Sequence, residues 1–167
     1  MKKIAILIEN MYDEQELIYP YHRAREDYEV HLVGTEKNKE YKSKSGLVLK
    51  STHASKDVDA KDYAGLIIPG GFSPDYMRKS QDTKDLVKAV YENGSPVAAI
   101  CHGPWMLASS LDMKDVDVTT VPNIKDDLVN AGANWADKEV VNSNGIITSR
   151  TPDDLPAFMK EFLNAIK

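Results

Sequence analysis

The stretch Val97-Ala98-Ala99-Ile100-Cys101-His102-Gly103-Pro104 indicates a buried strand, a sharp turn and the start of a helix. Four apolar residues stop at Cys-His, and Gly-Pro then breaks the strand and suits the first turn of a helix. Such a turn exposes the thiol of Cys101, the only cysteine of the chain, instead of packing it. Because N–H groups at a helix start favour a thiolate, we expect an activated nucleophile. The alternative is a small buried apolar residue, which is common for a free cysteine.

Around this stretch, apolar strands alternate with helices. Strands are predicted at 3–9, 28–34, 46–52, 64–69, 97–100, 116–120, 139–142 and 146–149, and helices at 13–27, 81–93, 104–110, 123–130 and from Pro152 onward. Asn144-Gly145 predicts a hairpin between the last two strands, and Thr151 is the expected cap of the last helix. The pattern predicts a single α/β domain over 1–167, a flavodoxin-like three-layer sandwich with a mostly parallel sheet and helices on both faces.

Composition excludes several kinds of protein. The 167 residues are 28% charged and 42% hydrophobic with a net charge of −5, which argues against a nucleic-acid or anionic-membrane partner. A lone cysteine cannot form an internal disulfide, and the apolar run after Met1 is too short for a signal sequence, so we expect a cytoplasmic protein. We expect no metal site, because the four histidines are scattered: His22, His31, His53 and His102.

Three unusual segments follow predicted strands: 10–16, Pro69-Gly70-Gly71 and Cys101-His102-Gly103. Because the carboxyl ends of parallel strands meet at one sheet edge, we expect them to converge. Gly70-Gly71 lacks the patterns of a phosphate-binding loop. The amides of Gly71 and His102 could instead form an oxyanion hole, although a plain tight turn explains the glycines equally well.

Acidic residues at this edge are candidate partners of the thiol. Asp13, Glu14 and Glu16 crowd one stretch, where acids often only stabilise a helix start. A buried carboxyl there would stay protonated and donate a hydrogen bond to the thiolate. Spacing does not choose among the three acids.

His102 is the candidate base, because it is adjacent to the nucleophile. A histidine base needs an acid to orient it, and Asp75 is the nearest candidate by strand topology. Asp75 could equally be a helix-capping or surface acid.

The sequence resembles the PfpI intracellular protease branch of the DJ-1/PfpI superfamily, within the class I glutamine amidotransferase-like fold. The resemblance runs nearly end to end and rests on five segments: Glu16-Leu17-Ile18-Tyr19-Pro20-Tyr21-His22-Arg23, Ile68-Pro69-Gly70-Gly71-Phe72-Ser73-Pro74-Asp75, Ala99-Ile100-Cys101-His102-Gly103-Pro104, 124–133 and 148–155. It implies that Cys101 is the nucleophile, that Glu16 contacts its sulfur, and that His102 pairs with it. It also implies that Asp75 orients His102 from a neighbouring subunit, so we expect a homo-oligomer of two or more chains.

Two positions depart from the family pattern. Asp75 and Asp13 stand where protease relatives usually carry Glu, and Asp13 is then only a secondary acid candidate. The shorter side chain of Asp75 predicts weak peptidase activity, whereas chemistry that needs only Cys101 and Glu16 is less affected. Trp105 stands where many relatives carry Gln, and its side chain either forms a wall of the pocket or packs in the core.

The resemblance implies a cofactor-free cysteine hydrolase that cleaves peptide or amide bonds. Alternatives are a deglycase or glyoxalase acting on dicarbonyl compounds or their adducts, and a non-enzymatic oxidative-stress sensor or holdase in which Cys101 is oxidised. Glutamine amidotransfer is less expected, because no distant His-x-Glu pair follows in the last third of the chain.

Overall fold

A mostly parallel sheet of seven strands forms the centre of the computed structural model, which describes all 167 residues. The strand order is β10-β11-β7-β6-β1-β2-β5, and every neighbouring pair is parallel except β10 and β11. The strands are β1 (Lys3–Leu7), β2 (Glu29–Gly34), β5 (His53–Ala54), β6 (Tyr63–Ile68), β7 (Val97–Ile100), β10 (Val141–Ser143) and β11 (Ile146–Ser149). The predicted α/β architecture is confirmed.

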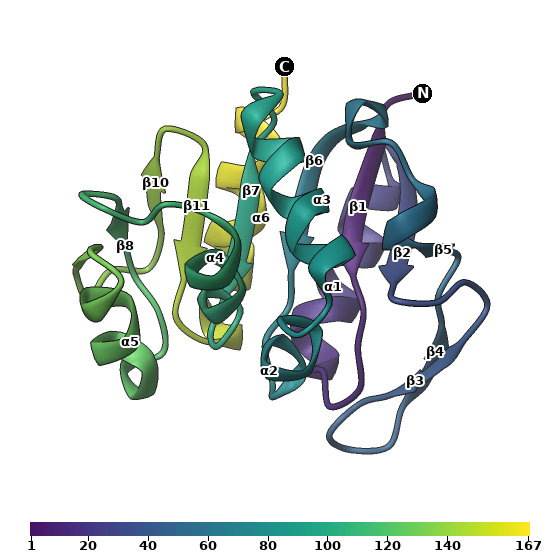
Figure 1. The fold of residues 1–167 in the computed structure, drawn as a ribbon, viewed down its shortest axis with the longest axis horizontal. Coiled ribbons are helices and arrows are strands. Elements are labelled where there is room, and N and C mark those ends of the chain that lie inside the picture. Colours follow the sequence, from purple (N-terminus) through teal and green to yellow (C-terminus); the bar gives the residue numbers. More distant parts are fainter.

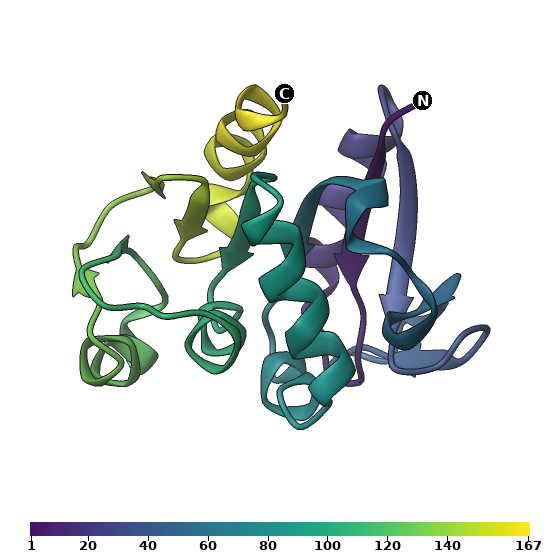
Figure 2. The same ribbon diagram turned by 45° about the horizontal axis from the view of Figure 1, so that its top comes forward.

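Helices cover both faces of the sheet and form two separate cores. On one face lie α2 (Ser73–Met77), α3 (Gln81–Glu92), α4 (Pro104–Ser110) and α5 (Lys125–Asn130), and on the other lie α1 (Glu14–Arg25) and α6 (Leu155–Ala165). Figure 2 shows α6 and α3 on opposite sides of the sheet. Alternate strand residues face the two layers: Ile4 and Ile6 pack toward α1 and α6, whereas Ala5 and Leu7 pack toward α3. No helix is long and apolar enough to cross a bilayer.

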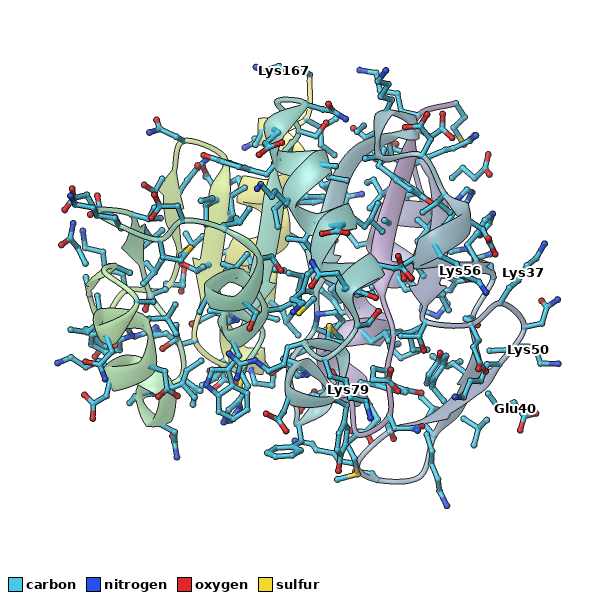
Figure 3. The ribbon with its side chains drawn as sticks, viewed as in Figure 1. Lys37, Glu40, Lys50, Lys56, Lys79 and Lys167 are labelled. Carbon is cyan, nitrogen blue, oxygen red and sulfur yellow. The ribbon has the colours of Figure 1, made fainter.

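The region between β2 and β5 differs from the prediction of one strand over 46–52. β3 (Glu40–Lys42) and β4 (Val48–Lys50) form an antiparallel hairpin outside the main sheet. Most residues of this hairpin are exposed, and several of them are charged. Figure 3 shows Lys37, Glu40 and Lys50 pointing away from the molecule. The short strand β5, which was not predicted, forms the edge of the main sheet parallel to β2.

The last third is partly as predicted. The hairpin at Asn144-Gly145 is confirmed, with positive φ at both residues (50° and 90°). A small second sheet of β8 (Asp117–Val118) and β9 (Asn134–Trp135) was not predicted as a pair. Thr151 makes no side-chain cap, so that prediction is wrong: a 3-10 turn at Pro152–Asp154 precedes α6.

Candidate active site

Cys101 lies on a sharp turn between β7 and α4, with φ of 63°. Positive φ is uncommon for a residue with a side chain, so the surrounding backbone must hold it there. The Cys101 N–H donates to the Ser149 carbonyl of β11 at 3.0 Å. Gly103 completes the turn, since a Cβ there would lie 2.6 Å from the Ile68 carbonyl oxygen. The half-buried thiol is thus presented at the carboxyl edge of the sheet, as expected.

The other two predicted segments do meet the turn. Tyr12 and Gly71 form an antiparallel bridge, which joins the loop after β1 to the loop after β6. Gly70 packs so closely that an added Cβ would lie 2.5 Å from Glu16 Oε1 and 3.0 Å from the His102 nitrogen. The convergence of the three strand ends is confirmed.

Among the three candidate acids, only Glu16 faces the thiol. Its side chain is fully buried, Oε1 accepts from the Gly70 N–H at 2.9 Å, and Oε2 has no hydrogen-bond partner. The carboxyl group lies close enough to the Cys101 thiol for each to shift the pKa of the other. Asp13 caps α1 by accepting from the Gln15 and Glu16 N–H groups at 3.0 and 3.2 Å. Glu14 turns toward the hairpin and accepts from the Ser45 N–H at 2.7 Å.

Burial sets the protonation of the Cys101–Glu16 pair. Burial, helped by the charge of Asp13, raises the pKa of Glu16 to about 8. Burial and then the Glu16 carboxylate raise the pKa of the Cys101 thiol to about 12. The expectation that the helix start alone favours the thiolate is therefore wrong, because burial beside a carboxylate outweighs it.

The two groups titrate together. The pair loses its first proton near pH 8 and keeps the second to about pH 12. In the singly deprotonated pair, the remaining proton lies mainly on sulfur, because the pKa of the thiol is the higher of the two. When that proton passes to Glu16, the carboxyl donates to a thiolate, which is the nucleophilic form.

Two backbone amides at the meeting point of the loops make no backbone hydrogen bond. Neither the Gly71 nor the His102 N–H donates to a backbone carbonyl, and the His102 amide contacts the Cys101 sulfur. Gly71 has φ of 70°, and an added Cβ would collide with the Met11 carbonyl, so only glycine fits. The geometry suits the predicted oxyanion hole.

His102 also contacts the nucleophile through its side chain. Its Nδ1 lies 3.4 Å from Cys101 Sγ, and burial followed by the nearby Lys44 charge lowers the pKa of the imidazole. A neutral ring at pH 7 can accept a proton from the thiol. Asp75 lies on α2, with its side chain 44% exposed and 3.9 Å from Arg78, and it makes no hydrogen bond to His102 of the same chain. Within one chain, the structure does not bring Asp75 to the site.

Sequence reasoning missed Lys44, which lies on the turn of the β3–β4 hairpin. Its Nζ is 2.7 Å from Asp13 Oδ2, and its charge acts on both Glu16 and His102. Because this contact depends on how the hairpin folds against α1, spacing alone could not reveal it.

Trp105 lies beside His102, with ring centroids 5.1 Å apart, so it walls the site as well as packing on the core. No cluster of three or more potential metal ligands is present. The largest cavity, about 660 Å³, lies between the loop after β1 and the start of α3 and is not lined by Cys101.

Comparisons with known proteins identify the family of the chain. The model of the DJ-1/PfpI family matches residues 2–165. "Putative cysteine protease YraA" of Bacillus subtilis (strain 168) is 46% identical over 167 residues, and "Deglycase PfpI" of Pyrococcus furiosus is 37% identical over 166 residues, each match covering 99% of both chains. A two-domain Anabaena variabilis protein with DJ-1/ThiJ/PfpI-like and ferritin-like domains has a crystal structure that superposes with a TM-score of 0.95 at 35% identity, over 98% of this chain and 48% of that one. The chain belongs to the DJ-1/PfpI family.

Proposed function

We propose that the protein is a cysteine-dependent enzyme that converts 2-oxoaldehydes, or releases their adducts from amines, as a glyoxalase or deglycase does. The observation that carries the proposal is the buried Cys101–Glu16 pair, which holds one mobile proton beside two free amides. This chemistry needs a thiolate and one acid–base group but no oriented imidazole. Relatives named deglycase, among them "Deglycase PfpI", support the substrate class.

In the first step the Cys101 thiolate adds to the aldehyde carbon. A carbon–sulfur bond forms, the carbonyl π electrons move to oxygen between the Gly71 and His102 amides, and the Glu16 carboxyl gives that oxygen its proton. With an amine adduct of the aldehyde, the thiolate displaces the amine, which leaves with that proton. Both routes give the same hemithioacetal and leave Glu16 as a carboxylate.

In the second step Glu16 removes the proton from the former aldehyde carbon, and the hydroxyl proton on that carbon passes to the ketone oxygen. Glu16 then returns its proton to the former ketone carbon. The hemithioacetal becomes a thioester of a 2-hydroxy acid, so one carbon is oxidised while its neighbour is reduced. Water then cleaves the thioester, releasing the 2-hydroxy acid and restoring the thiol. The net reaction adds one water and needs no external oxidant.

A second candidate function is peptide hydrolysis, which the 3.4 Å contact between His102 Nδ1 and Cys101 Sγ favours. "Putative cysteine protease YraA" supports this class. An amine leaving group needs a protonated imidazole, and hence an acid that stabilises it. We propose a homo-oligomer in which the exposed Asp75 of one chain reaches His102 of the next.

The test measures methylglyoxal consumption with lactate formation, and cleavage of fluorogenic peptides, for the wild type and Cys101→Ser. We expect turnover of methylglyoxal that falls by about 1,000-fold or more in Cys101→Ser. Full turnover by Cys101→Ser would refute the proposal. Selective oxidation of Cys101 by mild peroxide, with no turnover of either substrate, would favour a redox sensor instead.

A further inference from the structure

An aromatic side chain follows each candidate oxyanion amide in the chain, and these side chains lie near one another. Phe72 comes directly after Gly71, and Trp105 lies on the first turn of α4, where its N–H donates to the His102 carbonyl at 3.0 Å. Tyr76, one turn of α2 after Phe72, extends the group. We call Phe72, Tyr76 and Trp105 the aromatic rim.

The three rings contact one another edge to face. Phe72 lies 5.4 Å from Tyr76 and 6.0 Å from Trp105 between ring centroids, with interplanar angles of 81° and 84°. Phe72 is 44% exposed and Tyr76 39% exposed, and Tyr76 also lines the 660 Å³ cavity, so the rim presents apolar surface next to Trp105. Exposed rings gathered around reactive groups point to ligand contact, whereas a scattered exposed ring does not.

Trp105 is held in place from the side away from His102. Its Nε1 donates to Asp127 Oδ2 at 2.7 Å, and the Arg78 guanidinium lies 5.7 Å from its ring centroid. Arg78 also donates to the Trp105 carbonyl at 3.2 Å and to Ser109 Oγ at 2.9 Å. The indole is therefore fixed before any substrate binds, which lowers the entropic cost of using it as a wall.

The inner side of the Cys101 site has little room for a substituent. There Glu16 is fully buried, and Gly70 has no room for even one added carbon. We therefore place a substituent of the attacked carbonyl on the side of His102, whose ring centroid lies 5.1 Å from that of Trp105. A planar apolar group there would pack against the indole, whereas a methyl group offers less surface.

We propose that the aromatic rim is a specificity subsite, and that the preferred substrates carry a planar apolar substituent on the carbonyl unit attacked by Cys101. This inference rests on the proposed function and names its substrate class. One aromatic contact of this kind is worth about tenfold in specificity.

The experiment compares kcat/KM for phenylglyoxal and methylglyoxal, using wild type, Trp105→Ala and Trp105→Phe. We expect the wild type to prefer phenylglyoxal, Trp105→Ala to lower the ratio by about tenfold, and Trp105→Phe to restore most of it. Tyr91→Ala is the matched control, because Tyr91 contacts the Asn144 carbonyl at the opposite sheet edge and should leave the ratio unchanged. Circular dichroism and thermal unfolding verify that each variant folds, and Phe72→Leu serves if Trp105→Ala does not.

An unchanged ratio in folded Trp105→Ala would overturn the inference while leaving the proposed function intact. Equal losses on both substrates with a change in native mass would also overturn it, because the rim would then be a subunit contact. Turnover that survives in Cys101→Ser would instead refute the proposed function, so the two failures are distinguishable.

Discussion

At the scale of single residues, the decisive feature is a carboxyl group that folding has placed where it cannot easily ionise. Glu16 is fully buried with one oxygen bound by the Gly70 N–H and the other free toward Cys101. Burying a carboxylate costs free energy, so Glu16 keeps its own proton up to about pH 8. Once that proton is lost, the remaining proton of the pair can rest on the thiol and pass through Glu16 to the substrate oxygen during reaction.

Glu16→Gln tests this pairing. Turnover of methylglyoxal by the wild type should rise with pH through a midpoint near 8, because the active pair is singly deprotonated and is lost as the pH falls. Gln cannot exchange a proton, so kcat/KM should drop by about 100-fold or more. The measurement is kcat/KM from pH 6 to 10, with the rate of Cys101 alkylation recorded over the same range. An unchanged midpoint for both rates in Glu16→Gln would show that the carboxyl does not share the proton.

The position of the thiol on a turn after a strand was predictable from the sequence, because a strand that ends at Cys-His-Gly-Pro has few other geometries. The sequence did not show which of Asp13, Glu14 and Glu16 faces the thiol. All three lie within one helical turn, and their directions depend on the loop after β6 and on the β3–β4 hairpin.

At the scale of secondary-structure elements, the start of α1 couples helix stability to the site. Asp13 accepts hydrogen bonds from two N–H groups of the first turn, and its second oxygen pairs with Lys44 at 2.7 Å. Its charge also acts on Glu16, where it raises the pKa. One side chain therefore caps the helix and adjusts the acid.

Replacing Asp13 by Ala and by Asn separates these roles. Asp13→Ala should lower the free energy of unfolding by about 1 kcal/mol, because the cap is lost, whereas Asn caps nearly as well as Asp. Both variants remove the charge, so both should lower the pH midpoint of turnover relative to the wild type. Urea denaturation at constant pH and the pH profile of kcat/KM test the two effects. Equal stability of the Ala and Asn variants would contradict the capping role.

The edge strand β5 carries a pH-sensitive contact. His53 stacks on His31 with ring centroids 3.8 Å apart, and His31 in turn contacts Glu29 and the Tyr63 hydroxyl. Burial, followed by the charges of His31 and Lys37, lowers the pKa of His53. The folded state thus holds fewer protons than the unfolded one.

Stability should therefore fall as the pH drops below 6.5, the ordinary pKa of His53, until the folded-state pKa is passed. Urea denaturation at pH 7.5 and pH 5.5 measures the loss, which His53→Asn should reduce. His22→Asn, at an exposed histidine of α1, is the matched control and should keep the wild-type pH dependence. If both variants respond to acid alike, the stack is not the source of the loss.

Long elements were easier to predict than short ones. The main strands and α3 follow from apolar periodicity and from turn residues such as Asn144-Gly145. The pairing of β8 with β9 rests on two residues in each strand, a length at which tertiary contacts outweigh local preference. Thr151 was predicted to cap the last helix, but its side chain caps nothing, and a 3-10 turn at Pro152–Asp154 precedes α6. The Asp154 side chain in this turn accepts hydrogen bonds from Arg150.

At the scale of the whole molecule, the open question is how His102 obtains an acid. Asp75 is exposed on α2, and its one ion pair, with Arg78, is long at 3.9 Å. We propose that a neighbouring subunit supplies Asp75 to this site. Light scattering should therefore give a native mass that is a multiple of 18.6 kDa.

Mixing two inactive variants tests whether Asp75 acts across the interface. Asp75→Ala keeps the nucleophile but lacks the acid, and Cys101→Ser keeps the acid but lacks the nucleophile. If Asp75 serves the neighbouring His102, a mixed dimer regains one complete site, so an equal mixture should recover about a quarter of wild-type peptide hydrolysis. If Asp75 instead served His102 of its own chain, the mixture would recover no peptide hydrolysis, because no subunit would carry both Asp75 and Cys101. Mass spectrometry of the native mixture must show that the subunits exchange, and a mixture that exchanges without regaining activity would exclude a shared site.

Methylglyoxal turnover provides the internal comparison for the Asp75→Ala variant. This turnover depends on Cys101 and Glu16, so Asp75→Ala alone should retain it while losing peptide hydrolysis.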